Sequence, residues 1–353
     1  MNAIEKISEQ DRDLFRQSMR GFLADNWPAE KALVLSGDDV AIRKTWSGLC
    51  GLGAGSLGVL DDAVGLYEAL MLMEEFGRAA APFPLIDLLI ANTVLSGHAP
   101  VEPLLGSLQA GAVMPAFAAG AYDGDPNAGA LACNGETVSG NLAFVELLPD
   151  TKYLLALVED GPRLALIELV QAGVQIAATP GFAFPAYTRI MLDSAKAQLI
   201  SLPAQAAQDL NLIFRIGMAA RAMGAASRAF ELVLGYLQVR QQFGQPLGRF
   251  QALQHKLANS KIALDGARLT LFNAANFYDQ KSDDWRVFAS AAIAASASLR
   301  QVALETQHTF GAIGYSEEHE APRHFRRVHA DLTRSGGVRR AREELATYLL
   351  GSI

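Results

Sequence analysis

The chain has 353 residues, of which half are hydrophobic and 19% are charged, so it has enough apolar surface for more than one sizeable core. Its net charge of −7 is spread along the sequence, which argues against a nucleic-acid partner, because such a partner requires a basic stripe. The cysteines and histidines form no CxxC or HExxH pattern, so the sequence predicts no metal site.

The two cysteines and the N-terminus bear on the cellular compartment. Cys50 and Cys133 stand far apart among apolar or small residues, and we expect both to be buried free thiols. The first residues contain charged side chains and no apolar stretch of signal-peptide length. No run reaches the roughly 18–20 apolar residues of a membrane span. We therefore expect a soluble cytoplasmic protein.

Apolar residues in the first third recur with helical spacing. Within residues 9–23 the stripe consists of Leu14, Phe15, Met19, Phe22 and Leu23. A second helix is expected at 65–77, where Gly77 provides a C-terminal cap. A third is expected at 85–95, after the breaker Ala81-Pro-Phe-Pro84.

Short apolar runs separated by turn signals replace this pattern between about 110 and 200. The runs lie at 113–119, 130–133, 137–145, 153–158, 164–169 and 190–192, with a loop at 120–127. Strands at roughly ten-residue spacing favour a small antiparallel barrel or sandwich.

Long helical patterns return after residue 204. They cover about 209–239, 253–278, 285–310 and 337–350, which predicts a four-helix bundle. The fold class is therefore α+β with three domains: an N-terminal helical domain (1–110), a β domain (111–203) and the bundle (204–353). Small residues on the first long helix, Gly217, Ala219, Ala220 and Gly224, either leave room for a bulky ligand or permit close helix packing, and packing is favoured.

The first long C-terminal helix ends in the most specific motif of the chain. It reads Tyr236-Leu-Gln-Val-Arg240-Gln-Gln-Phe243-Gly244-Gln-Pro-Leu247-Gly-Arg-Phe250-Gln251. This segment resembles the Arg-x-x-Phe-Gly pattern of the acyl-CoA dehydrogenase family, in which the Arg contacts the pyrophosphate of an FAD bound mainly by the neighbouring subunit. The resemblance implies FAD contacts at Arg240, Phe243, Leu247, Phe250 and Gln251, and a guanidinium is suited to phosphate oxygens.

A second segment, Gln307-His308-Thr-Phe310-Gly311-Ala312-Ile-Gly314-Tyr315, resembles the Gln-x-x-Gly-Gly-x-Gly-Phe/Tyr stretch of the same family. It implies FAD contacts at His308, Gly311 and Ala312. His308 replaces the usual Gln, and Ala312 replaces the second Gly. In the middle region, Met114-Pro-Ala-Phe-Ala-Ala-Gly120 stands where the family has its Thr-Glu-Pro strand.

The family reaction is α,β-dehydrogenation of an acyl-CoA thioester, in which a carboxylate removes the α-proton and hydride passes to flavin N5. Counting from the two motifs, the two positions where family members carry this carboxylate hold Ser335 and Phe214. Arg215, which follows the second position, is retained, and the resemblance implies a substrate-binding role for it. Weak candidates for a relocated base are Glu317 and Glu318, with Glu320 and Asp331 nearby.

Several functions remain open from the sequence. The first is an FAD-dependent acyl-CoA dehydrogenase of fatty acid or steroid side-chain catabolism, acting as a homodimer or homotetramer with an electron-transfer flavoprotein as acceptor. The second is a non-catalytic, flavin-site-sharing subunit that associates with a Glu-bearing sister subunit, for example in a heterotetramer. A divergent acyl-CoA oxidase-like flavoprotein and a flavin-free assembly subunit are further alternatives.

Overall fold

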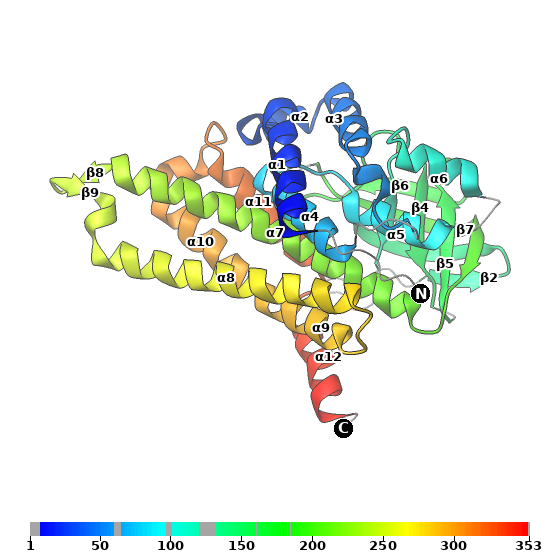
Figure 1. Cartoon of the computed structure of the whole chain (residues 1–353). Coiled ribbons are helices and arrows are strands. Elements are labelled where there is room, and N and C mark those ends of the chain that lie inside the picture. The colour runs from blue at the N-terminus through cyan, green and yellow to red at the C-terminus, as the bar shows by residue number, and fades with distance from the viewer. Residues whose placement is uncertain are drawn as a thin grey trace.

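The computed structural model of the chain describes residues 8–59, 65–96, 101–119, 131–159, 161–181, 183 and 185–351. Helices occupy both ends of the sequence and strands occupy the middle, in the predicted order. The expected loop at 120–127 lies outside the described residues. Figure 1 shows a long helical bundle on one side of the molecule and the sheet on the other.

The described part of the N-terminal region consists of α1 (Glu9–Asn26), α2 (Ala32–Leu35), α3 (Asp39–Gly51), α4 (Leu66–Arg78), α5 (Leu85–Leu95) and α6 (Glu102–Gln109). Ser8 starts α1 by accepting a hydrogen bond from Asp11 N, and Asp38 starts α3 by accepting from two backbone amides. Helices α4 and α5 match the predicted ones. Nearly every residue of α5 is buried, so this helix lies inside the molecule.

The middle region forms one sheet of β1 (Ala116–Ala118), β2 (Leu131–Asn134), β3 (Thr137–Val145), β4 (Tyr153–Leu157), β5 (Arg163–Glu168), β6 (Val174–Ala178) and β7 (Thr188–Ser201). The strand order is β1-β4-β5-β7-β3-β2, and β6 also pairs with β7. Strand β1 runs parallel to β4, whereas the other pairs are antiparallel. The sheet is therefore mixed at one edge. The sequence led us to expect antiparallel strands throughout, because apolar spacing carries no information about strand direction.

Two strands differ from the sequence expectation. Strand β7 has 14 residues, although only 190–192 was expected, because Asp193, Lys196 and Gln198 point to solvent and interrupt the apolar run. Strand β6 was not expected; its sequence, Val-Gln-Ile-Ala-Ala, is mostly apolar, although most of its residues are exposed. Cys50 is buried as expected, but Cys133 is only half-buried because it lies in the short strand β2.

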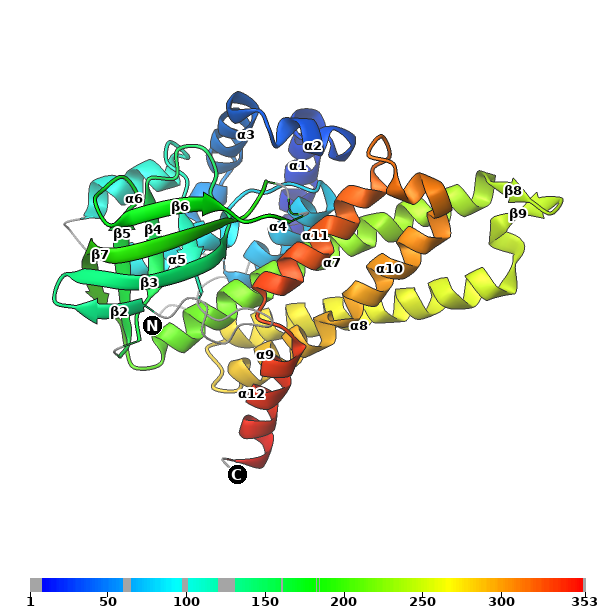
Figure 2. The ribbon, with the colours of Figure 1, turned by 180° about the vertical axis from the view of Figure 1, so that it is seen from behind.

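The C-terminal region consists of α7 (Ala206–Val239), α8 (Gln251–Asp279), α9 (Trp285–Ser296), α10 (Ser298–Phe310), α11 (Ala321–Arg334) and α12 (Val338–Leu350). The expected single helix at 285–310 is split at Ala297 into α9 and α10. Helix α11 was not expected, because its sequence is rich in arginine and histidine and its buried face includes charged side chains. Figure 2 shows α11 lying along α7 on the side opposite α8.

Glycines bring α4 and α7 into close contact. A Cβ atom on Gly224 would overlap the carbonyl of Glu74, and one on Gly77 would overlap the carbonyl of Arg221. Gly217 packs in the same way against Ile86 of α5. The small residues of α7 at Gly217 and Gly224 therefore serve close helix packing, as favoured from the sequence.

Buried apolar residues form two clusters. One joins the N-terminal helices to the bundle, and the other lies within the sheet. By length and composition, Trp285–Tyr315 is the one stretch among the described residues that could cross a membrane, and 44% of its most apolar window is buried. This stretch is divided into α9 and α10, which pack against α7 and α8. Its apolar residues are therefore explained by their place in the core of the bundle.

Candidate functional site

The two motif segments meet at one end of the bundle. After α7, a hairpin of β8 (Gln241–Gln242) and β9 (Gln245–Pro246) leads through a 3-10 turn into α8. The ring centroid of Tyr236, one turn before Arg240, lies 5.3 Å from that of Phe310, which directly precedes the turn Gly311–Tyr315. We call residues 240–251 together with 308–315 the bundle tip. Figures 1 and 2 show its hairpin at the end of the molecule farthest from the sheet.

The bundle tip presents an exposed cation, an exposed ring and an irregular backbone. Phe243 is 90% exposed and has a φ of +51°, while Gly244 and Gly311 have φ values of +76° and +63°. Such left-handed residues are unusual outside glycine, and they turn the chain sharply. Arg240 is exposed and, within the part of the chain that the structure describes, forms no ion pair.

The remaining residues expected to contact flavin belong to the same two segments: Leu247, Phe250, Gln251, His308 and Ala312. The rings of Phe250 and Phe243 lie 6.1 Å apart in an edge-to-face arrangement. The Gln307 side chain donates to the carbonyl of Gly314 and so fixes the second turn. The two segments that carry the eight expected residues thus meet at the Tyr236–Phe310 contact, although they lie about 60 positions apart in the sequence.

The two positions of the family base also converge, at a different place. Phe214 of α7 is fully buried, and its ring centroid lies 5.4 Å from that of Phe117 in β1. Ser335, which follows α11, is 2% exposed and donates its hydroxyl to the carbonyl of Leu332. The guanidinium carbon of Arg334 lies 4.9 Å from the centre of the Phe214 ring. The two positions thus share one buried space, which side chains fill.

Arg215 links this space to the C-terminal helix. Its Nε donates to the carbonyl of Ser335 at 2.8 Å, and its Nη1 lies 2.9 Å from both carboxylate oxygens of Glu344 in α12. The side chain is 1% exposed, and Gly336, with a φ of +83°, packs against its guanidinium. Burial lowers the pKa of Arg215, while Glu344 opposes that shift. The residue expected to bind substrate is therefore engaged within the chain.

Behind Phe214 lies a buried ionic cluster that the sequence did not reveal. Glu146, directly after β3, accepts hydrogen bonds from Arg221 at 2.8 Å, Arg327 at 3.0 Å and Arg334 at 2.8 Å. Asp331 accepts two further bonds from Arg221, at 2.9 and 2.7 Å. These five residues, which we call the Glu146 cluster, connect the sheet to α7 and α11. The available signal was Arg221 itself, a lone charge within Met218-Ala-Ala-Arg-Ala-Met-Gly.

The cluster contains three cations and two anions, all at most 7% exposed. Burial alone would raise the pKa of Glu146, but the three guanidinium groups outweigh burial and lower it to about 2. Burial raises the pKa of Asp87, and Arg334 opposes this shift. The Asp87 carboxylate accepts a hydrogen bond from Phe117 N at 2.8 Å. The charges around Phe214 are thus largely compensated within the chain.

The weak candidates for a relocated base lie elsewhere. Glu317 and Glu318 are exposed before α11, and Glu317 pairs with Arg326 at 2.6 Å. Glu320 is bound by Arg228 and His324 at 2.8 Å each. These glutamates stand at the opposite end of the 14-residue helix α11 from Ser335, roughly 20 Å away. Asp331 is close to Ser335 but belongs to the Glu146 cluster.

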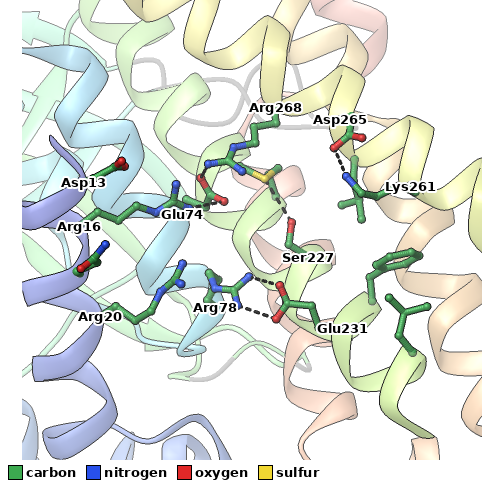
Figure 3. A pocket seen from close by; sticks show the side chains of 15 residues that line it. Asp13, Arg16, Arg20, Glu74, Arg78, Ser227, Glu231, Lys261, Asp265 and Arg268 are labelled. Atoms are coloured by element: carbon green, nitrogen blue, oxygen red, sulfur yellow. Dashed lines mark hydrogen bonds and ion pairs between the residues drawn. The ribbon is translucent and has the colours of Figure 1, made fainter. Parts of the chain in front are cut away.

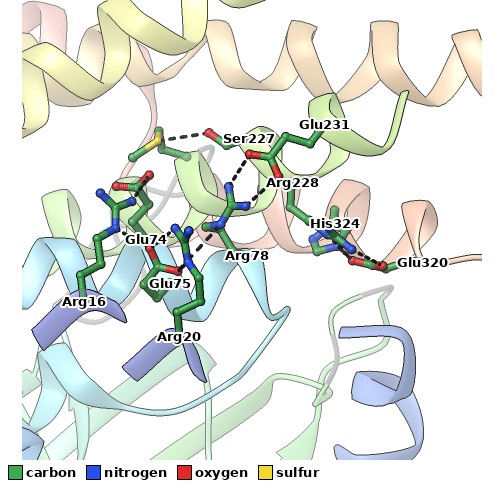
Figure 4. Close-up of polar contacts among 11 residues, drawn as sticks. Arg16, Arg20, Glu74, Glu75, Arg78, Ser227, Arg228, Glu231, Glu320 and His324 are labelled. Carbon is green, nitrogen blue, oxygen red and sulfur yellow. Dashed lines mark hydrogen bonds and ion pairs between the residues drawn. The ribbon is translucent and has the colours of Figure 1, made fainter. Parts of the chain in front are cut away.

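A groove of about 510 Å³ lies between α1, α4, α7 and α8, with Met223, Phe230 and Leu264 among its apolar lining residues. Figure 3 shows that its charged side chains face one another, for example Arg78 with Glu231 at 2.7 Å. Figure 4 shows the adjoining network, in which Arg16 and Arg20 of α1 reach Glu75. The groove contains none of the residues expected to bind flavin or to act as the base.

The residues at the two places fit different parts of an FAD. An exposed guanidinium, an exposed ring and the glycines Gly244 and Gly311 at the bundle tip suit a diphosphate and an adenosine. The space around Phe214 is filled by rings and paired ions, so it does not fit a thioester stacked against a flavin. Phe214 and Arg240 also lie 26 residues apart on or beside one helix, roughly 39 Å. Within the described residues no group of three His, Cys, Asp or Glu side chains could hold a metal ion.

Comparisons with known proteins agree with this architecture. Residues 205–345 match the family described as acyl-CoA dehydrogenase, C-terminal domain. Acyl-CoA dehydrogenase FadE34 of Mycobacterium tuberculosis is 29% identical over 306 residues, which cover 83% of this chain and 40% of FadE34. The chain thus spans about two fifths of the length of that relative.

Two further similarities extend over most of the chain. Acyl-CoA dehydrogenase IpdE2 of Mycobacterium tuberculosis is 26% identical over 337 residues, which cover 91% of both proteins. A solved variant of the Tcur3481-Tcur3483 steroid ACAD has a TM-score of 0.85 at 25% identity and covers 97% of this chain and 98% of that chain. The order of helices and strands, the two motif segments and these similarities agree, and they identify residues 205–345 as an acyl-CoA dehydrogenase C-terminal domain.

Proposed function

We propose that the chain is a non-catalytic subunit of a heteromeric acyl-CoA dehydrogenase and lends its bundle tip to the flavin of a base-bearing partner chain. The observation that carries this proposal is the convergence of Phe214 and Ser335 in one filled space. Removal of a thioester α-proton requires a base within hydrogen-bond reach. A phenyl ring cannot accept that proton, and an unaided hydroxyl does not do so near neutral pH.

Three of the carboxylates around this space are bound by arginines, whereas Asp87 accepts a hydrogen bond from Phe117 N. Glu146 and Asp331 bind the arginines of the Glu146 cluster, and Glu344 binds Arg215 and Arg340. A carboxylate held at a pKa of about 2, as Glu146 is, is a poor proton acceptor. These engagements weigh against a self-sufficient dehydrogenase, the first alternative from the sequence, and against an acyl-CoA oxidase-like protein that needs the same base.

The bundle tip supports the positive part of the proposal. Arg240 is exposed and has no ion pair among the described residues, and Phe243 is almost fully exposed. An unpaired guanidinium beside an exposed ring is suited to a diphosphate next to an adenosine. Because these groups lie at the far end of α7, they would serve a cofactor whose ring lies in the other subunit. When bound, FAD would supply the hydride acceptor there, and this chain would hold its phosphate end.

The proposed substrate class is supported by the relatives. Family members act on acyl-CoA thioesters, and the Tcur3481-Tcur3483 protein is a steroid ACAD whose name pairs two chains. We infer that the assembly acts on the CoA thioester of a steroid-derived acid, with a fatty acyl-CoA as the alternative. An electron-transfer flavoprotein is the expected electron acceptor.

The first experiment uses the chain expressed alone. The purified protein is mixed with FAD, separated from free flavin and titrated anaerobically with butyryl-, octanoyl-, palmitoyl- and steroid-derived CoA thioesters. We expect no bleaching of flavin absorbance by any of them. Full bleaching by one thioester would show that the chain has its own base and would overturn the proposal.

The second experiment tests the bundle tip in the assembly. The chain is co-expressed with a family member that retains the catalytic Glu, and the flavin-to-protein ratio of the complex is measured. Loss of a charge-assisted hydrogen bond in Arg240→Ala should weaken flavin binding by roughly tenfold or more. Arg249→Ala, on the same exposed hairpin segment, is the matched control. Equal flavin retention in both variants would remove Arg240 from the site.

A further inference from the structure

One buried amide holds the second motif segment from inside the bundle. Gln307 lies in the last turn of α10 and is 5% exposed, and its Nε2 donates to the carbonyl of Gly314. Gly314 belongs to the turn Gly311–Tyr315 and is the one buried residue of that turn. The Gln of the family pattern falls at His308, so the pattern itself assigns no role to Gln307.

The turn is fixed on its inner side and anchored to α7. A Cβ atom on Gly314 would lie 2.8 Å from the carbonyl oxygen of Gln307 and 3.0 Å from the Cβ of Phe310, so Gly314 packs directly against the end of α10. The Phe310 ring contacts Tyr236, one turn before Arg240, with 5.3 Å between the ring centroids. Gln307 thus sets the shape of the turn, and Phe310 sets its place beside the first motif segment.

The outer side of the same turn faces solvent. Gly311, Ala312 and Ile313 are exposed, and the first two were expected to contact flavin. Gly311 has a φ of +63°, which side chains other than glycine rarely adopt, so the direction of the exposed backbone depends on how the turn is held. A backbone site binds most tightly when buried hydrogen bonds hold it in its bound geometry before the ligand arrives. Gln307 supplies such a hydrogen bond.

We propose that Gln307 is a positioning residue of the bundle tip: its hydrogen bond to Gly314 holds the backbone at Gly311 and Ala312 in the geometry that receives the diphosphate end of FAD. This inference rests on the proposed function. The side chain acts through the turn, because its amide is buried and already bonded to Gly314. Without that donor the buried Gly314 carbonyl would lose this partner, and the turn would rearrange toward water. FAD would then have to order the turn as it binds, which lowers its affinity.

The test uses the complex of this chain with a family member that retains the catalytic Glu. The complex is freed of flavin and titrated with FAD while flavin fluorescence is followed. Gln307→Leu removes the donor and should weaken FAD binding by roughly fivefold or more. Gln301→Leu is the matched control and should leave the affinity unchanged, because Gln301 is exposed on the same helix and donates to Glu305 at 2.8 Å. Equal affinities for both variants, each shown to be folded by circular dichroism, would overturn the proposal.

Gln307→Glu tests the donor itself at nearly constant side-chain size. A protonated carboxyl can donate to the Gly314 carbonyl, whereas an ionised one can only accept and would repel that oxygen. Relative to the wild-type complex at the same pH, this variant should bind FAD almost equally well near about pH 5 and roughly tenfold or more weakly near about pH 8. An equal loss of affinity at both pH values would contradict the role of the donor.

Arg240→Ala in the same titration separates this inference from the proposed function. If Arg240→Ala weakens FAD binding and both Gln307 variants bind as the wild type does, only the role of Gln307 is overturned. If Arg240→Ala also binds FAD as the wild type does, the bundle tip is not a flavin site, and the proposed function is overturned as well.

Discussion

Replacing Glu146 by Gln tests whether the Glu146 cluster holds the sheet to the bundle. The variant keeps the size of the side chain but removes the charge that accepts three hydrogen bonds at 2.8–3.0 Å. In the variant, Asp331 is the one anion left in the Glu146 cluster to balance three buried guanidinium groups. Removal of one partner from a buried ionic group costs about 3–5 kcal/mol. The pKa of Glu146 gives a second value for this free energy. It is about 2 in the folded state and 4.5 for an unperturbed Glu, a difference that corresponds to about 3 kcal/mol of stability.

Urea unfolding followed by far-ultraviolet circular dichroism measures this effect. At pH 7 we expect Glu146→Gln to lower the free energy of unfolding by about 3–5 kcal/mol. Because the folded-state pKa is depressed, the contribution of Glu146 is present above about pH 4.5 and is lost as the pH falls toward 2, so the two proteins should converge in acid. Glu317→Gln, which removes an exposed pair with Arg326, is the control and should change stability by less than about 1 kcal/mol. A loss below 1 kcal/mol for Glu146→Gln at pH 7 would refute the reasoning.

Two further predictions concern packing and pH. Gly224→Ala should destabilise the chain by about 1–3 kcal/mol or prevent folding, because its Cβ would overlap the Glu74 carbonyl. Gly235→Ala, on the exposed side of the same helix, is the control and should stabilise the chain by about 0.5–1 kcal/mol. Similar melting temperatures for the two variants would contradict the close contact between α4 and α7. Burial lowers the pKa of His324, although Glu320 opposes this shift. The neutral side chain therefore stabilises the fold above about pH 6.5, and this contribution is lost as the pH falls through the folded-state pKa. His324→Gln should therefore reduce the loss of unfolding free energy between about pH 7 and 5, and an unchanged pH profile would exclude His324 as its source.

The sequence information on the bundle tip is local. Arg240, Phe243 and Gly244 follow one another within a few residues, and the turn at Gly311 has its own glycine pattern. Counting from these anchors also located Ser335 and Phe214, and the structure brings those two positions together across 121 residues of sequence. Motifs with fixed spacing thus indicated the family and the two positions at which its members carry the base.

The Glu146 cluster could not be predicted in the same way. Glu146 contacts residues 75 to 188 positions away, and no local pattern pairs a residue at the end of a strand with arginines on two helices. Helix α11 was missed for a related reason. Its buried face includes Arg323, Arg327 and Asp331, which hydrophobic spacing counts as solvent-facing. Buried ion pairs satisfy one another only after the long-range fold is known.

Under the proposed function, the two family base positions differ from a base-bearing site in their surroundings as well as in residue type. A carboxylate placed at residue 335 would lie beside Arg334 and next to the guanidinium of Arg215, which already binds the backbone there. One at residue 214 would face the Arg334 guanidinium that now lies over the ring. Both environments favour the ionised carboxylate and so lower its basicity. A single substitution to Glu would restore the residue type of the family, but the new carboxylate would be a weak proton acceptor. Glu146 and Glu344 hold the surrounding arginines in place, so these cations would stay beside the new carboxylate and favour its ionised form. In the proposed assembly, the Arg240 end of α7 can therefore contribute to a shared flavin site, whereas its Phe214 end cannot supply a base.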